Sequence, residues 1–216
     1  MVSQPIFHQA LLPFLFCITT LSLVVADPTD GFTRLPSPSS NFQIQKHYDL
    51  PQNKCYTFSN GVYRFWVYTN DTSSTGTRAR CELRIGNYYT SGVLQFEGYF
   101  YIPNGTTGTT IHQVVSSGVS AAAATATTSQ STVYHGSLTH FLSPTLETNI
   151  YDKWYRFSLI HDVGANNVKI FINGVQKFNG NGQVAGSHYM KIGVYAHEGA
   201  SHYVESRWRN IKLFTR

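Results

Sequence analysis

Short segments in which apolar and polar residues alternate follow one another along most of the chain. Residues 61–68 read GVYRFWVY, and residues 93–102 read VLQFEGYFYI. Side chains alternate between the two faces of a strand, so this pattern predicts β-strands that are buried on one side. In the second segment one face carries Gln95, Glu97, Tyr99 and Tyr101. Further strands are expected at 80–85, 109–115, 154–160, 168–172, 189–196 and 208–214.

Turn residues separate these segments, and no long helix is expected beyond the first 26 residues. Asn173-Gly174 predicts a type I′ hairpin turn between two strands. Many short strands with frequent turns predict an all-β fold, either a two-sheet β-sandwich or a jelly roll. The low-complexity stretch at 116–132 is expected to be a flexible loop or a weak strand.

The N-terminus predicts a secretory signal peptide over residues 1–26. An apolar run from Ala10 to Val25 ends at Val24-Val25-Ala26, where small residues suit a cleavage site. The run is too short and too interrupted to cross a membrane, so no span is expected in the mature chain. Residues 27–40 are expected to form an extended lead-in, and residues 41–216 a single domain located outside the cell, in the wall or in the vacuole.

The charge of the chain favours small anions or acidic polysaccharides as ligands. The net charge is +5, and the Lys and Arg residues are scattered rather than gathered in a block that would bind nucleic acid. Nine histidines are present, but none lies in an H-x-H or H-E-x-x-H arrangement. No metal or other cofactor is therefore expected, and His135 and His140 are expected at the surface beside a turn. The domain is expected to be monomeric.

Two cysteines and two sequons fit an oxidising compartment. Cys55 and Cys81 follow the signal peptide, and they form either one disulfide or two separate buried thiols. Asn70 and Asn104 begin N-x-Thr sequons in polar, turn-like stretches, which suits glycosylated surface loops.

Charged residues occupy every second position of the segment RCELRI at 80–85. Arg80, Glu82 and Arg84 share one face of the expected strand, and Cys81, Leu83 and Ile85 share the core face. Taken alone, the charged face is typical of a solvated surface, where ion pairs contribute little.

A second and a third strand carry polar residues that change this interpretation. In YMKIGVYAH, Tyr189, Lys191, Tyr195 and His197 fall on one face with Gly193 between them. The segment 109–115 adds Gln113. A glycine among long polar side chains leaves space above a sheet, so the three strands predict a groove for a carboxylated ligand.

These three segments resemble blocks of the alginate lyase type-2 family, polysaccharide lyase family 7. RCELR resembles its R-[ST]-E-L-R block, YMKIGVYAH resembles its Y-F-K-A-G-x-Y-x-Q block, and Gln113 falls where its Q-[IV]-H block begins. The chain is more similar still to the plant citrate-binding proteins of the same superfamily. The segments 27–32, 151–175 and 205–214 support the resemblance, which implies a concanavalin-like β-jelly roll whose concave sheet holds the ligand.

The resemblance also implies roles for individual residues. In the family, Arg and Gln neutralise the uronate carboxylate, His is the base, and Tyr is the acid or takes both roles. Arg84 (or Arg80), Gln113, Tyr195 and the family's lysine, here Lys191, match.

The family's histidine has no match, because Val115 occupies its position. His112 is next to Gln113 but points to the opposite face unless a bulge intervenes. His197 replaces the family's final Gln and shares the face of Tyr195, so it is a candidate for a relocated base.

Two functions are consistent with these residues, and the sequence leaves open whether the protein is an enzyme. The favoured one is a binder of citrate or acidic uronate saccharides, whose ligand would contact Arg80, Glu82, Arg84, Tyr189 and Lys191. The alternative is a polyuronate lyase in which Tyr195 is both base and acid, helped by Gln113, Arg84 and His197. A glycoside hydrolase is disfavoured because Glu82 and Glu97 are the acidic residues expected near the groove and no strand offers an E-x-D-x-x-E pattern.

Overall fold

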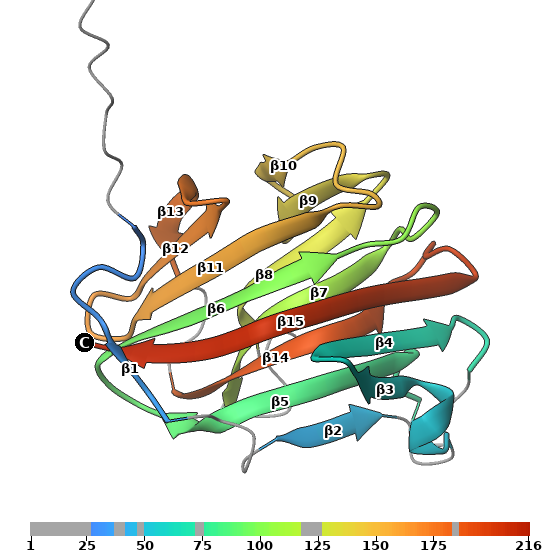
Figure 1. Cartoon of the computed structure of the whole chain (residues 1–216), viewed down its shortest axis with the longest axis horizontal. Coiled ribbons are helices and arrows are strands. Elements are labelled where there is room, and N and C mark those ends of the chain that lie inside the picture. The colour runs from blue at the N-terminus through green and yellow to red at the C-terminus, as the bar shows by residue number, and fades with distance from the viewer. Residues whose placement is uncertain (1–26, 37–41, 47–49, 72–75, 118–126, 183–185) are drawn as a thin grey trace, which may run out of the picture.

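Two antiparallel β-sheets lie face to face in the computed structural model (Figure 1), which confirms the predicted two-sheet jelly roll. The structure describes residues 27–36, 42–46, 50–71, 76–117, 127–182 and 186–216. The expected signal peptide, the end of the lead-in and the centre of the low-complexity stretch lie outside these ranges. Within the described ranges, no helix is long and apolar enough to cross a membrane.

The first sheet, here called the back sheet, contains eight strands. Its order is β13 (Val175–Asn181), β12 (Asn167–Ile172), β11 (Trp154–Asp162), β6 (Val93–Tyr101), β15 (Tyr203–Thr215), β4 (Val62–Tyr68) and β3 (Tyr56–Ser59), with β1 (Thr33–Arg34) beside β15. Asn173 and Gly174 join β12 to β13 with φ values of 51° and 83°. These are the left-handed conformations that a type I′ turn requires, as the sequence predicted.

The second sheet, here called the groove sheet, contains seven strands. Its order is β10 (Thr145–Glu147), β9 (Ser137–His140), β8 (Thr127–Tyr134), β7 (Thr109–Ser117), β14 (Ser187–Ala196), β5 (Arg80–Tyr89) and β2 (Gln43–Lys46). The described part of the low-complexity stretch therefore belongs to β7 and β8. A short 3-10 helix, η2 (Gln52–Lys54), precedes β3.

The core lies between the two sheets and is rich in aromatic rings. Its largest fully buried side chains are Trp208, Phe65, Phe96, Phe100 and Phe157. Burial of such a side chain contributes about 1.5–3 kcal/mol, so these rings account for much of the packing between the sheets.

A disulfide joins the segment before β3 to the core face of β5. Cys55 and Cys81 are both fully buried, and their Cα atoms lie 5.9 Å apart. Of the two alternatives that the sequence left open, the structure contains the disulfide.

One histidine was placed wrongly from the sequence. His140 was expected at the surface, but it is 4% exposed and its ring lies 3.9 Å from that of Phe178. The back-sheet strand β13 supplies this ring, and the pattern around His140 gives no sign of that distant contact. His135 is exposed and turns the chain between β8 and β9 with φ of 46°.

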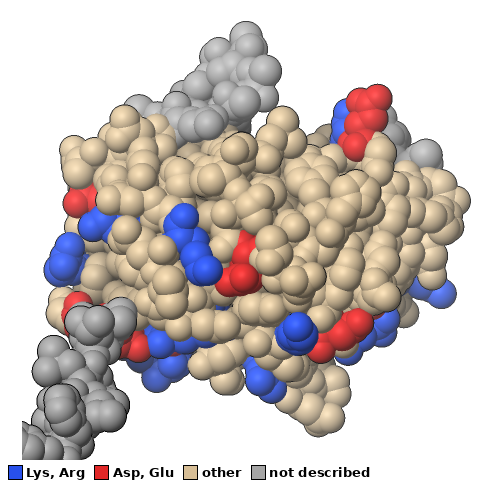
Figure 2. Space-filling view, turned by 90° about the horizontal axis from the view of Figure 1, so that it is seen from above, with Lys and Arg blue, Asp and Glu red and all other residues tan. Residues whose placement is uncertain are grey.

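Charged side chains are distributed over the face of the molecule seen from above. Figure 2 shows Lys and Arg scattered among uncharged residues, several of them next to Asp or Glu, rather than gathered in one block. The described part of this face therefore carries no large basic field.

Candidate functional site

Alternation along β5 separates its charged residues from its apolar residues. Cys81, Leu83 and Ile85 lie in the core, and Arg80, Glu82 and Arg84 therefore take the opposite face of the groove sheet, here called the groove face. The neighbouring strand β14 places Tyr195 opposite Arg80 and Lys191 opposite Arg84.

Strand β7 completes the set on the other side of β14. Gln113 pairs with Lys191, and Val115 pairs with Tyr189. Three strands that are distant in the sequence thus bring together the polar residues that the sequence selected.

Two hollows open on the groove face and share one wall. The first has a volume of about 470 Å³ and is lined by Arg80, Glu82, Gln113, Val115, Thr127, Gln130, Phe141, Tyr189, Lys191 and Tyr195. The second has a volume of about 460 Å³ and is lined by Ile44, Gln45, Lys46, Arg80, Tyr189 and Lys191. Because Arg80, Tyr189 and Lys191 line both, the hollows are adjacent on the groove face, and together they are here called the groove.

Glu82 organises the floor of this groove. It is 2% exposed, accepts a hydrogen bond of 2.6 Å from Gln113 Nε2, and accepts one of 3.3 Å from Lys191 Nζ. A buried carboxylate without partners is costly, so this pairing fixes the positions of both the amide and the ammonium group.

The groove keeps a positive balance after this pairing. Among the described residues, the charged side chains that line the two hollows are Lys46, Arg80, Lys191 and Glu82, which sum to a net +2. Such a surface attracts carboxylates and can hold them by charge-assisted hydrogen bonds.

Arg84 stands beside the two hollows and does not line either of them. Its guanidinium carbon lies 4.0 Å from the ring centroid of Tyr88 and 5.0 Å from that of Tyr189, and its Nη1 donates to Gln43 Oε1 at 3.3 Å. Arg84 therefore supports the Tyr189 wall, and its direct contact with a ligand stays a prediction. Burial is the main cause that raises the pKa of Tyr189, so this wall is a neutral phenol.

Gly193 has a different role from the one that the sequence suggested. It adopts φ of +140°, and a Cβ there would lie 2.4 Å from the carbonyl oxygen of Cys81. The glycine therefore permits the close approach of the β5 and β14 backbones, directly opposite Glu82.

His112 is remote from the groove. It is fully buried, and its ring centroid lies 4.9 Å from those of both Phe96 and Phe157. Burial lowers the pKa of His112 to about 3, so it is a neutral core residue.

Regular alternation explains why His112 and Gln113 face opposite ways and why Val115 shares the groove face with Gln113, although a bulge precedes His112. The pairing of β7 with β8 shifts register between Thr110 and His112, which leaves Ile111 as the extra residue. Ile111 and His112 both lie on the core side, and the alternation resumes with Gln113 and Val115 on the groove face.

His197 is held by other side chains at the end of the groove. Its Nε2 lies 2.7 Å from Thr110 Oγ1, and its Nδ1 lies 3.1 Å from the hydroxyl of Tyr134. Burial, with a smaller effect of Arg78, lowers its pKa, so the imidazole is neutral. The ring centroids of His197 and Tyr195 are 6.1 Å apart.

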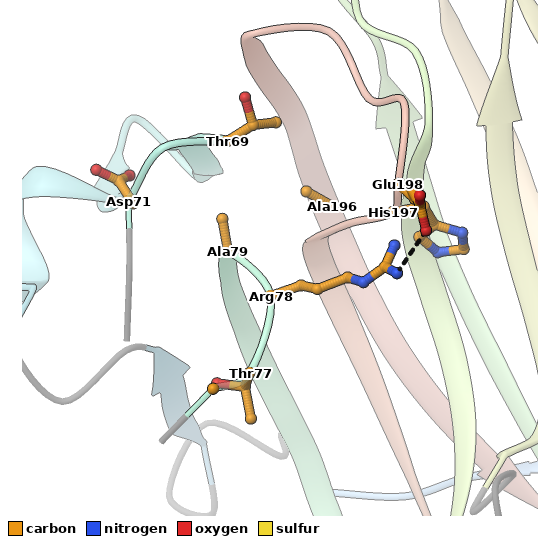
Figure 3. Close-up of a pocket in the computed structure, with 9 residues that line it drawn as sticks. Thr69, Asp71, Thr77, Arg78, Ala79, Ala196, His197 and Glu198 are labelled. Atoms are coloured by element: carbon orange, nitrogen blue, oxygen red, sulfur yellow. Dashed lines mark hydrogen bonds and ion pairs between the residues drawn. The ribbon is translucent and has the colours of Figure 1, made fainter. Parts of the chain in front are cut away.

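His197 lines a third hollow rather than the groove. This hollow has a volume of about 380 Å³, and its lining includes Asp71, Arg78 and Glu198 (Figure 3). Arg78 extends across it and donates to Glu198 at 3.1 Å. Both ring nitrogens of His197 are within hydrogen-bond distance of other side chains, and these contacts hold the ring in place.

Sequence reasoning missed one edge of the groove and misplaced one acid. Ile44, Gln45 and Lys46 of β2 line it, although the short alternation QIQK could have indicated a strand there.

Glu97 was expected near the groove, but it lies on the outer face of the back sheet, bonded to Arg156 at 2.6 Å. Alternation identifies the face of a strand and gives no information on which sheet the strand joins.

The two predicted glycosylation sites lie at the surface. Asn70 and Asn104 are both exposed in turns, where a glycan could be accommodated. Among the described residues, no group of three or more His, Cys, Asp and Glu could hold a metal ion.

Comparisons with known proteins agree with this geometry. The Alginate_lyase2 family model, described as alginate lyase, matches residues 23–215. A citrate-binding protein from Hevea brasiliensis is 44% identical over 218 residues, which cover 94% of this chain and 90% of that protein.

Solved structures of alginate lyases show the same fold. The marine PL7 alginate lyase of Zobellia galactanivorans aligns with a TM-score of 0.60 and 16% identity over 86% of this chain and 94% of that one. The alginate lyase of Corynebacterium sp. aligns with a TM-score of 0.60 and 14% identity over 77% and 83% of the two chains.

Proposed function

The chain belongs to the alginate lyase 2 family, and from this premise we propose that it binds carboxylated ligands, either citrate or acidic uronate saccharides, in the groove. The observation that carries the proposal is the combination of a net +2 charge in the groove with Val115 at the position of the family's histidine. A groove with cations and no histidine on its floor can neutralise a carboxylate but lacks the usual proton acceptor.

Three described cations of the groove would contact the ligand. Lys191 is paired with Glu82, Arg80 lines both hollows, and Lys46 lines the second one. Arginine offers two parallel N–H donors to a carboxylate, and lysine offers a point charge. The resemblance to a protein named for citrate binding supports a ligand with closely spaced carboxylates.

The alternative function is β-elimination on a polyuronate. Its support is that Gln113 and Tyr195 line the same hollow as Arg80. In that reaction the C5 proton is removed, the bond between C4 and the bridging oxygen breaks, and the departing oxygen takes up a proton. Tyr195 would have to perform both transfers, because His112 is buried in the core and His197 is engaged by Thr110 and Tyr134.

Calorimetric titration of the mature protein with citrate and with oligogalacturonate tests the proposal. We expect saturable binding that weakens roughly tenfold or more in Arg80→Gln, since a charge-assisted hydrogen bond contributes about 1.5–3 kcal/mol. Lys169→Gln is the matched control, because it removes one cation from the half-buried outer side of β12 on the other sheet. Equal affinity of Arg80→Gln and the unmodified protein for both ligands would exclude this groove as the site.

The same samples distinguish a binder from a lyase. A lyase produces an unsaturated uronate that absorbs in the ultraviolet, and Tyr195→Phe should abolish that signal. A binder gives no such product, and Tyr195→Phe should alter its affinity only slightly.

The location of the protein is part of the proposal. We expect cleavage after Ala26, glycans at Asn70 and Asn104, and delivery to the cell exterior or the vacuole. Sequencing the N-terminus of the purified native protein checks this, and a product that begins at Met1 would contradict it.

A further inference from the structure

The outer face of the back sheet, opposite to the groove, carries arginines stacked on aromatic rings. The guanidinium carbon of Arg64 lies 4.8 Å from the ring centroid of Trp66, and that of Arg207 lies 5.1 Å from Tyr101. Arg209 lies 4.2 Å from Trp154. We call this set, together with Tyr99, the arginine–aromatic row.

Strand register places the row across the sheet rather than along one strand. Arg64 of β4 pairs with Arg207 of β15, which pairs with Tyr101 of β6, which pairs with Trp154 of β11. Neighbouring strands are about 4.8 Å apart, so four strands span roughly 14 Å. A site of this length suits several linked sugars better than one small acid.

Arg209 differs from its neighbours in its electrostatic partners. Arg64 and Arg207 both bind the buried Glu205, at 2.7 and 2.6 Å. Arg209 contacts Trp154 and, at 5.7 Å, Tyr99, and within the described part of the chain it has no carboxylate at ion-pair distance. Its Nε is buried without a hydrogen-bond partner among these residues.

The row retains a positive charge and lies on an open part of the sheet. The described charged residues of the row and its bonded neighbours are Arg64, Arg207 and Arg209 on one side and Glu205 and Asp152 on the other, so their net charge is +1. Asp152 is counted because it accepts a hydrogen bond of 2.9 Å from the Tyr101 hydroxyl. At the other end of this sheet, Thr33 and Arg34 of β1 pair with β15 (Figure 1).

We propose that the arginine–aromatic row is a second binding surface, specific for a chain of carboxylated sugars. The rings offer flat apolar faces for sugar stacking, and a guanidinium stacked on a ring keeps its N–H edge available for a carboxylate. Arg209 is the anion-binding residue of the surface, and Trp154 and Tyr99 hold it in position. A polymer bound here leaves the groove on the opposite face accessible.

The test measures retention of the full-length mature protein on immobilised polygalacturonate, with the methyl-esterified polymer as the uncharged control. It is carried out in an Arg80→Gln background, so that the groove and the row are assessed separately. Arg209→Gln removes the cation, Arg209→Lys keeps the charge without the planar fork, and Lys169→Gln removes one cation elsewhere on the same sheet.

We expect Arg209→Gln to weaken retention by roughly fivefold or more, which corresponds to about 1 kcal/mol, with Arg209→Lys in between and Lys169→Gln unchanged. If Arg209→Gln does not fold, Arg209→Lys is used instead, and it should be retained less than Lys169→Gln. Equal losses in Arg209→Gln and Lys169→Gln, equal retention on the esterified polymer, or no loss in Arg209→Gln would each overturn the proposal. If retention is already lost in the Arg80→Gln background alone, all polymer binding occurs in the groove, and the row is not a site.

Discussion

Replacing His112 by leucine should make the protein less sensitive to acid. The imidazole is fully buried against Phe96, Phe157 and Trp208, and neither ring nitrogen has a hydrogen-bond partner among the described residues. Leucine is similar in size, removes the two unpaired polar atoms and cannot be protonated. Near pH 8 we expect a small net change, because lost ring contacts offset a gain of about 1–3 kcal/mol from those atoms.

The pH dependence of this effect can be calculated from the pKa values. Burial lowers the pKa of His112 to about 3 in the folded state, from 6.5 in the unfolded chain. The unfolded chain therefore binds more protons as the pH falls below 6.5, and the folded state loses stability. Between about pH 8 and about pH 5 the loss at this one residue is about 2 kcal/mol, and it is absent with leucine.

Urea unfolding followed by tryptophan fluorescence, at both pH values and with the disulfide intact, measures the effect. The free energy of unfolding of His112→Leu, relative to the unmodified protein, should increase by about 2 kcal/mol on acidification. His202→Gln is the control, because it removes one exposed imidazole and leaves the buried His112 in place. Parallel pH dependences for His112→Leu and the unmodified protein would refute the assignment of a neutral, buried imidazole.

Three further predictions concern the groove and its support. The double variant Cys55→Ser/Cys81→Ser opens a link over 26 residues and should lose about 3 kcal/mol of unfolding free energy, measured by urea titration. Glu82→Gln leaves Lys191 as an uncompensated buried charge and should cost about 3–5 kcal/mol, whereas adding Lys191→Met should restore part of the loss in thermal melts. Gly193→Ala should lower the melting temperature and also weaken citrate binding in calorimetry, because its Cβ would collide with the carbonyl of Cys81 and displace β5.

The faces of individual strands could be predicted because alternation is a local property. Arg80, Glu82 and Arg84 share the groove side of β5, and the alternation of β14 assigns Lys191 to the same side. Their approach across strands depends on pairings between distant segments, and here the family resemblance supplied what local periodicity could not. Glu97 shows the limit of local periodicity. Its strand was predicted correctly, but that strand belongs to the back sheet and not to the groove sheet.

The exposure of the site residues was the property that sequence reasoning estimated least well. A pattern of charges on every second position looks like a solvated surface, yet Glu82 is 2% and Lys191 is 6% exposed. Their burial results from Gln113, which crosses from β7 to bond Glu82, and from residues of other strands that line the groove. None of these contacts has a local signature in RCELRI.

The residue two positions after Gln113 decides between the two functions more than any charge does. Regular alternation puts Gln113 and Val115 on the groove face, so valine stands where the family resemblance places a histidine, and the adjacent His112 points into the core. The floor of Glu82, Gln113 and Lys191 would be the same in a lyase and in a binder, because both must neutralise a carboxylate. Elimination needs, in addition, a group that accepts the C5 proton, and the two histidines nearest in sequence or in space are buried in the core or held by other side chains. With the neutralising groups retained and valine at the position of the proton acceptor, carboxylate binding is the function that these residues support best.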